Sequence, residues 1–237
     1  MSHLPRRAEA ELMDDPAVAM AYHQADFSEP NQRLVERAIE LTAALGAGPE
    51  SPLEVIDLGC GPAEIPLRLA ARCPGWHITA VDGAPAMLSI ARREIDRAGH
   101  RSRITLVLAD AVRSGQPGGT FDVVVSNSLL HHVRSPAQLW REIDRLVRPG
   151  GQVLLRDLFR PDDAATIDAL VQATVPADQP ILQREFRNSL NAAYTVREVH
   201  EQLRQADMDW LAVEVVSERH LEAAGVRPPE PAESLDL

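Results

Sequence analysis

The chain has 237 residues, which is enough for one α/β domain with a sizeable core. Hydrophobic residues make up 45% and charged residues 25% of the composition, as is usual for a globular protein. The formal net charge of −11 argues against broad electrostatic binding to DNA, RNA or an anionic membrane surface.

Cysteine content and hydropathy limit the class of protein further. Two cysteines, Cys60 and Cys73, cannot build a disulfide framework or a four-cysteine zinc site. No apolar run approaches the length of a membrane span, and the first residues lack the apolar core of a signal peptide. We therefore expect a cytoplasmic protein without membrane insertion.

Two helices are predicted ahead of the first strand. Residues 1–11 are polar, so we expect a flexible N-terminus. An aspartate followed by Pro16 is a helix start, and Gly46 is typical of the end of a second, amphipathic helix. Residues 12–46 are thus predicted to form a helical cap.

The stretch from Leu53 to Ala71 organises the chain. It begins as an apolar strand, breaks at G-C-G-P and resumes as a helix. A strand that runs through glycines into a helix makes a backbone pocket, because a ligand can approach main chain without meeting a Cβ atom. Asp57 lies near the end of the strand, where open α/β sheets bind ligands. The alternative is a tight turn that binds nothing.

The pattern D-x-G-x-G differs from two common nucleotide-binding motifs. The dinucleotide fingerprint needs glycine at the position of Glu64, and a phosphate loop needs a Gly-Lys-Ser/Thr ending that is absent. An acidic residue at this place repels a pyrophosphate and attracts a cation.

The next two strands also end in acidic residues. The strand His77–Val81 leads to Asp82, whose carboxylate can accept hydrogen bonds from both hydroxyls of a ribose. A helix follows from Pro85 to Ala98, and the third strand, Arg103–Leu108, leads to Asp110. The alternative for either aspartate is capping of the following turn or helix.

The fourth strand is predicted over Phe121–Ser126, a nearly continuous apolar run that is typical of a strand buried on both faces. A helix is predicted over Pro136–Val147, R-P-G-G is a turn signal, and the fifth strand follows over Gln152–Leu158.

Two adjacent histidines, His131 and His132, follow the fourth strand. We expect them to point in different directions, one as a general base, because histidine titrates near neutrality. The alternative is that both are packing residues. Without an H-E-x-x-H motif or a nearby Cys/Asp cluster, no metal site is expected.

Residues 161–193 interrupt the strand–helix alternation and are predicted to form two inserted helices, Ala164–Val175 and Ile181–Ala193. A helix capped by Thr195, with Glu198 completing a capping box, comes next. It is followed by a strand over Trp210–Ser217 and a hairpin partner over His220–Ala224. The main domain would extend over residues 12–225, with a disordered acidic tail over 226–237.

Several of these motifs, in this order, resemble those of class I S-adenosylmethionine-dependent methyltransferases. The resemblance covers about residues 53–217 and includes D-L-G-C-G, Asp82, Asp110, F-D-V-V-V-S-N and L-V-R-P-G-G-Q-V-L-L-R-D. The fourth-strand region is similar to the small-molecule and quinone-type branch, and not to the N-P-P-Y type. One departure is Ala63, where the family often has a third glycine.

The resemblance implies a Rossmann-like α/β fold with a seven-stranded, mostly parallel sheet, helices on both faces and an antiparallel last strand. The N-terminal cap would partly cover the cofactor, and residues 161–193 would form a helical lid that reads the acceptor. The cofactor would be S-adenosylmethionine, leaving as S-adenosylhomocysteine.

The resemblance also implies roles for individual residues. The expected cofactor-binding residues are Asp57, Gly59, Cys60, Gly61, Asp82, Gly83, Met87, Asp110, Ala111, Asn127 and Tyr22. His131 and Tyr22 are candidates for catalysis, and the candidates for acceptor contacts are His132, Arg156, Arg184 and Arg187. Alternatives stay open: Tyr22 and Met87 as packing residues, Arg156 as an ion-pair partner of Asp157, and the two lid arginines as solvated side chains.

The expected reaction is direct methyl transfer to a small-molecule acceptor. An RNA or protein methyltransferase is the second hypothesis, which the acidic balance disfavours. A cofactor-binding protein that does not methylate is the third. We expect no DNA partner, and the sequence leaves open the acceptor and whether the protein is a monomer or a homodimer.

Overall fold

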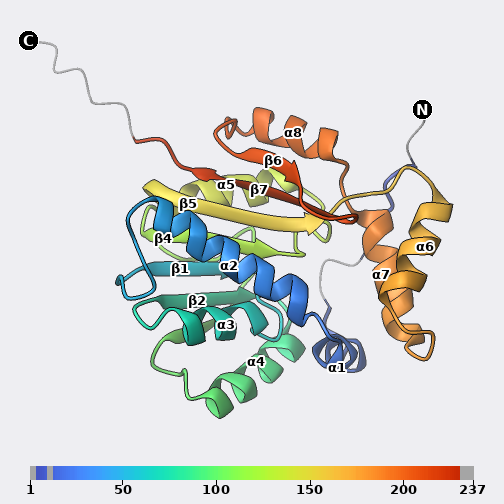
Figure 1. The fold of residues 1–237 in the computed structure, drawn as a ribbon, viewed down its shortest axis with the longest axis horizontal. Helices are drawn as coiled ribbons and strands as arrows, with labels where there is room; N and C mark the ends of the chain where they lie inside the picture. Colours follow the sequence, from blue (N-terminus) through green and yellow to red (C-terminus); the bar gives the residue numbers. More distant parts are fainter. Residues whose placement is uncertain (1–3, 10–12, 230–237) are drawn as a thin grey trace, which may run out of the picture.

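The computed structural model describes residues 4–9 and 13–229 (Figure 1). Its centre is a seven-stranded sheet in the order β3-β2-β1-β4-β5-β7-β6. The pairs among β1 to β5 are parallel, whereas β7 is antiparallel to both β5 and β6. This confirms the predicted fold class. The strands are β1 (Glu54–Leu58), β2 (His77–Asp82), β3 (Ile104–Leu108), β4 (Phe121–Asn127), β5 (Val147–Leu158), β6 (Ala212–Val215) and β7 (His220–Val226).

Helices cover both faces of the sheet, because alternate residues of the central strands point to opposite sides. Val55 and Leu154 pack with α2, α3 and α4, whereas Ile56 and Leu155 pack with α5 and α8. The helices on these faces are α2 (Ser28–Ala44), α3 (Glu64–Arg72), α4 (Pro85–Ala98), α5 (Pro136–Leu146) and α8 (Val196–Gln205). In the described part of the chain, no helix has both the length and the apolar character needed to cross a membrane.

Three further helices gather at the carboxyl ends of the parallel strands. They are α1 (Pro16–Gln24), which Asp15 caps, α6 (Ala164–Thr174) and α7 (Pro180–Ala192). Figure 1 shows α6 and α7 beyond the end to which the arrow of β5 points. Helix α7 packs against both α6 and α1. The inserted helices therefore lie where the predicted lid would have to be.

The described part of the N-terminus is docked, which differs from the expectation of a flexible segment over residues 1–11. Nε of Arg6 donates to the carbonyl of Ala192 at 2.6 Å, and its Nη2 donates to the carbonyl of His131 at 2.9 Å. The guanidinium also lies 4.1 Å from the ring centroid of Tyr194. Composition predicted mobility, but one arginine fork supplies several donors that hold the segment.

The ends of the last strands also differ from the prediction. Strand β7 reaches Val226, and the backbone of Arg227 bonds to Gly150 and Gly151 at 2.9 Å. The predicted tail therefore begins later than residue 226, and residues 230–237 lie outside the described range. The R-P-G-G turn is included in β5, with a register shift opposite β4 between Phe121 and Val123.

The predicted capping box at the start of α8 is confirmed. The backbone N–H of Glu198 donates to Oγ1 of Thr195 at 3.2 Å, and the N–H of Thr195 donates to Oε2 of Glu198 at 2.7 Å. We expect Thr195→Ala to lower the free energy of unfolding by about 1 kcal/mol, because an N-terminal donor of the helix loses its acceptor. Urea denaturation measures the change. Thr195→Ser keeps the hydroxyl and should lose much less; equal losses in both variants would contradict the cap.

Candidate functional site

The glycine loop between β1 and α3 has a left-handed backbone at three positions. The φ angles are +76° at Gly59, +53° at Gly61 and +66° at Ala63. A Cβ atom at Gly61 would meet no protein atom within 4 Å, whereas one at Gly59 would lie 2.8 Å from Cδ1 of Leu129. Gly61 therefore borders open space beside the N-terminus of α3, and Gly59 is needed for packing.

Ala63, the one departure from the family pattern, has the backbone conformation that explains why glycine is common at this position. It is fully buried and has left-handed dihedrals at the N-cap of α3. A left-handed residue with a Cβ atom costs about 1–2 kcal/mol, so glycine is favoured here and alanine carries the smallest possible side chain that is not glycine.

Asp57 is the most constrained acidic group of the site. Its side chain lies on β1 with 1% exposure, and its Oδ1 has no hydrogen-bond partner. Burial, together with the nearby charge of Asp82, raises the pKa of Asp57 to about 8. A buried carboxylate without a partner is costly, and a cationic ligand would offset that cost. The acidic pair Asp57 and Asp82 thus fits a cofactor that carries positive charge.

Asp82 ties the glycine loop to the end of β2. Its Oδ2 accepts a hydrogen bond from the N–H of Gly61, and its Oδ1 accepts one from the N–H of Ala84, each at 2.8 Å. Burial raises the pKa of Asp82 more than these backbone donors lower it. The loop is fastened further because the N–H groups of Gly59 and Cys60 both donate to the carbonyl of Val81.

Other predicted cofactor residues lie at the same edge of the sheet. Asp110 is exposed after β3, where its Oδ1 accepts from the N–H of Val112 at 3.0 Å. Asp110 therefore caps the following turn, which was the alternative to a contact with the cofactor. Its carboxylate still has acceptor sites left for a ligand. The remaining ones are Cys60 and Ala111, which are buried, Gly83 between β2 and α4, and Asn127 at the end of β4.

Tyr22 and Met87 bring the helical cap to this edge. Met87 is 3% exposed and packs with Ala19 of α1, and Tyr22 lies against the same cluster. The ring of Tyr22 also lies 4.8 Å from that of Phe27. Burial, followed by the charge of Glu64 and of other carboxylates including Asp57 and Asp82, raises the pKa of Tyr22. Tyr22 therefore lies close enough to these carboxylates to be affected by their charge.

His131 is held by Asp157, for which the sequence suggested an ion pair with Arg156 and not a contact with a histidine. Its Nδ1 lies 2.5 Å from Oδ1 of Asp157, and both side chains are buried. Oδ2 of Asp157 accepts from the N–H of Leu130 at 2.6 Å. Burial works to lower the pKa of His131, but the charge of Asp157, its hydrogen bond to the ring and the charge of Glu9 together outweigh burial and raise it.

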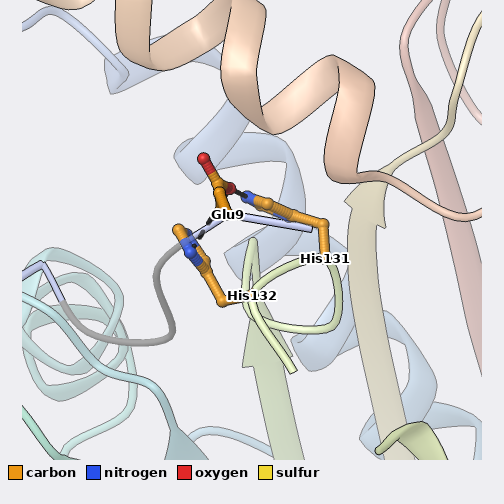
Figure 2. Close-up of side chains that lie close together, drawn as sticks. All are labelled: Glu9, His131 and His132. Carbon is orange, nitrogen blue, oxygen red and sulfur yellow. Dashed lines mark ion pairs between the residues drawn. The ribbon is translucent and has the colours of Figure 1, made fainter. Parts of the chain in front are cut away.

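The two histidines do not point in different directions, so that expectation is wrong. Their ring centroids are 4.2 Å apart, and both rings face Glu9 (Figure 2). His131 Nε2 and His132 Nδ1 lie 3.5 Å and 3.3 Å from Oε1 of Glu9. The histidines belong to a turn after β4, in which neighbouring side chains diverge less than they do in a strand. No sequence signal indicated Glu9, which lies in the segment expected to be flexible.

Arg156 lies on the opposite face of β5 from Asp157, so the two do not pair. Its Nη2 donates to Oε2 of Glu222 at 2.7 Å, and Arg37 donates to the other oxygen of the same carboxylate at 2.9 Å. The structure thus shows an ion-pair network between α2, β5 and β7. Contact between Arg156 and an acceptor stays a prediction.

The lid arginines lie on the outer surface. The side chains of Arg184 and Arg187 are 63% and 42% exposed. Arg184 donates to Glu185 at 2.8 Å, and Arg187 pairs with Asp168 of α6. These contacts favour the alternative of solvated arginines, and a role at the acceptor stays a prediction.

Comparison with known proteins adds an independent observation. Residues 56–155 match a family model described as a methyltransferase domain. They form a class I S-adenosylmethionine-dependent methyltransferase domain. The methyltransferase match begins on β1 and ends on β5, so it includes the glycine loop, Asp82, Asp110 and the His131 turn.

Curated relatives and a solved structure agree with this family. Trans-aconitate 2-methyltransferase of Streptomyces coelicolor is 34% identical over 60% of this chain and 46% of that protein. Ubiquinone biosynthesis O-methyltransferase of Pseudomonas aeruginosa is 36% identical over 45% of each. The chain thus spans about half the length of these relatives. A SAM-dependent methyltransferase structure from Aquifex aeolicus has a TM-score of 0.62 at 15% identity, over 90% of this chain and 98% of that one, which supports the fold alone.

The raised pKa of Asp57 predicts a pH-dependent stability. Between its usual value of 3.8 and about 8, the folded state binds more protons than the unfolded state, so this carboxyl's stabilising contribution is lost as pH rises. Asp57→Asn removes the titration. We expect the Tm of the variant, relative to that of the original protein, to increase from about pH 5 to about pH 8.5. Scanning calorimetry at both pH values measures it, and a constant difference would contradict a buried, unpaired Asp57.

Proposed function

We propose that the protein transfers a methyl group from S-adenosylmethionine to a small-molecule acceptor by direct displacement. The observation that carries this proposal is the buried carboxyl group of Asp57, whose Oδ1 has no hydrogen-bond partner, beside a glycine loop that borders open space at Gly61. The family match supports the same conclusion. Because the chain spans only about half of its curated relatives, their activity comes to this chain as a proposal.

The cofactor would supply an activated methyl group on a sulfonium centre, and the chain's residues would bind and orient it. Asp57 would balance the positive charge, and Asp82 would accept from ribose hydroxyls while it holds Gly61 in place. Asp110 and the backbone at Ala111 would meet the adenine. Catalysis would come mainly from proximity, alignment and exclusion of water by the cap residue Tyr22 and its neighbours.

The acceptor would enter between α1, α7 and the turn after β4, where the described helices gather at the strand ends. The names of two relatives, trans-aconitate 2-methyltransferase and ubiquinone biosynthesis O-methyltransferase, favour a small molecule. A release factor glutamine methyltransferase of Chlorobaculum tepidum, 39% identical over 41% of this chain, keeps a protein acceptor as the second candidate. The net charge of −11 disfavours RNA. We include in the proposal a cytoplasmic location, which the buried free thiols of Cys60 and Cys73 suit, and action as a monomer or homodimer.

Gly61→Val tests whether the cofactor approaches the glycine loop. The added side chain meets no protein atom but is strained at φ +53°, so we expect a less stable but folded protein that binds S-adenosylhomocysteine at least about tenfold more weakly in calorimetry. Gly99→Val is a matched control, because Gly99 also has a positive φ, +73°, and open space but lies at the end of α4. If both variants bind alike, the loop is only a turn.

Asp82→Asn tests the proposed ribose contacts. It keeps the size and one acceptor but loses the charge, which is worth about 1.5–3 kcal/mol in charge-assisted hydrogen bonds, or roughly 10- to 100-fold in affinity. Unchanged affinity for S-adenosylhomocysteine in the folded variant would refute the assignment. Turnover of labelled cofactor with a metabolite panel, and in parallel with total RNA, separates small-molecule from RNA methylation.

A further inference from the structure

We propose that Glu9, His131 and His132 form a binding site for a divalent transition-metal ion, with zinc as the best fit to this ligand set (Figure 2). The three residues come from two distant segments: the docked N-terminal segment and the turn after β4. The inference is separate from methyl transfer and does not rest on it.

The spacing of the ligand atoms fits a zinc ion. Oε1 of Glu9 lies 3.5 Å from Nε2 of His131 and 3.3 Å from Nδ1 of His132, and all three ligand atoms lie within 4.8 Å of one another. Tetrahedral zinc with bonds of about 2.0–2.1 Å requires ligand atoms roughly 3.3–3.4 Å apart. Two of the three separations already have this length, so a small rotation of one ring would complete the triangle.

Asp157 gives His131 the orientation and tautomer that a metal ligand needs. Nδ1 of His131 lies 2.5 Å from Oδ1 of Asp157, which directs Nε2 toward Glu9. Two backbone N–H groups, those of Leu130 and Leu158, hold the Asp157 carboxylate at 2.6 Å and 2.7 Å. A carboxylate that accepts from the second ring nitrogen is the usual support of a metal-bound histidine.

The surroundings favour a cation at this place. Side-chain exposure is 3% for His131, 13% for His132 and 12% for Glu9, so the cluster is largely removed from water. Removing an ionised carboxylate from water is costly, and the hydroxyl of Ser189 offers Oε1 of Glu9 one hydrogen bond, at 3.1 Å. A divalent ion would offset that cost and fasten the N-terminal segment to the end of β4.

Three protein ligands leave one coordination position of zinc for water or for an oxygen or nitrogen donor of a ligand. The site lies at the carboxyl end of β4, at the same edge of the sheet as the glycine loop. The competing explanation is a metal-free ion-pair cluster in which protonated histidines share the Glu9 carboxylate.

Metal titration of the tag-free, chelator-treated full chain decides between the two. We expect calorimetry to show one Zn²⁺ per chain, and Co²⁺ to give the visible absorption of a tetrahedral site. Glu9→Gln and His132→Ala should each weaken Zn²⁺ binding by at least about 100-fold, and Asp157→Asn by about 10- to 100-fold. His77→Ala, an exposed histidine at the start of β2, is the control and should bind as the original protein does.

The proposal is overturned if the original protein takes up no stoichiometric Zn²⁺, or if Glu9→Gln and His132→Ala bind it as tightly as the control. Both variants change residues outside the Asp157 contact, so loss of folding, checked by circular dichroism, should not obscure the result. S-adenosylhomocysteine binding, measured on the same samples, should change less than about threefold in Glu9→Gln. If the original protein bound Zn²⁺ but not S-adenosylhomocysteine, the proposed function would fail and the metal site would stand. If it bound S-adenosylhomocysteine but not Zn²⁺, only the metal site would fail.

Discussion

The carboxyl group of Asp57, buried at the end of a central strand with no hydrogen-bond partner for its Oδ1, is the constraint on which the site depends. Asp57 is held there by β1, which lies between two other buried strands, so it cannot move to water. Asp82 lies close enough to raise its pKa further. Burial of Asp57 destabilises the free protein, whereas a bound ligand with positive charge would make the ionised carboxylate favourable. The residue that lowers the stability of the free protein is therefore the residue that would bind the ligand.

The topology explains why the other groups collect around Asp57. Strands β1 and β4 are neighbours although β2 and β3 intervene in sequence, so the strand order reverses here, which is where open α/β sheets bind ligands. The glycine loop follows β1 and the turn with His131 follows β4. Helix α1 carries Tyr22, on which the carboxylates of Asp57 and Asp82 act, and α7 packs against α1.

The sequence allowed most elements to be predicted, because buried strands and amphipathic helices have distinct periodicities. The seven-stranded, mostly parallel sheet followed from the family resemblance, and its strand order came only from the structure. Asp57 and Asp82 could also be predicted as site residues, since each follows an apolar run. Contacts between distant segments were not. Glu9 meets the histidines only because Arg6 docks the N-terminus, and Arg156 bonds to Glu222 only because β7 pairs with β5. Polar residues in such contacts leave no periodic pattern that sequence reasoning can use.

Proton release on cofactor binding tests the central claim most directly. Calorimetry of S-adenosylmethionine binding near pH 7, in buffers of different ionisation enthalpy, counts the protons exchanged. Asp57, with a pKa of about 8, is mostly protonated in the free protein, and a bound cationic group should make it ionise. The account predicts release of about one proton per site, and loss of that release in Asp57→Asn. Binding without proton release, or equal release in the variant, would contradict it.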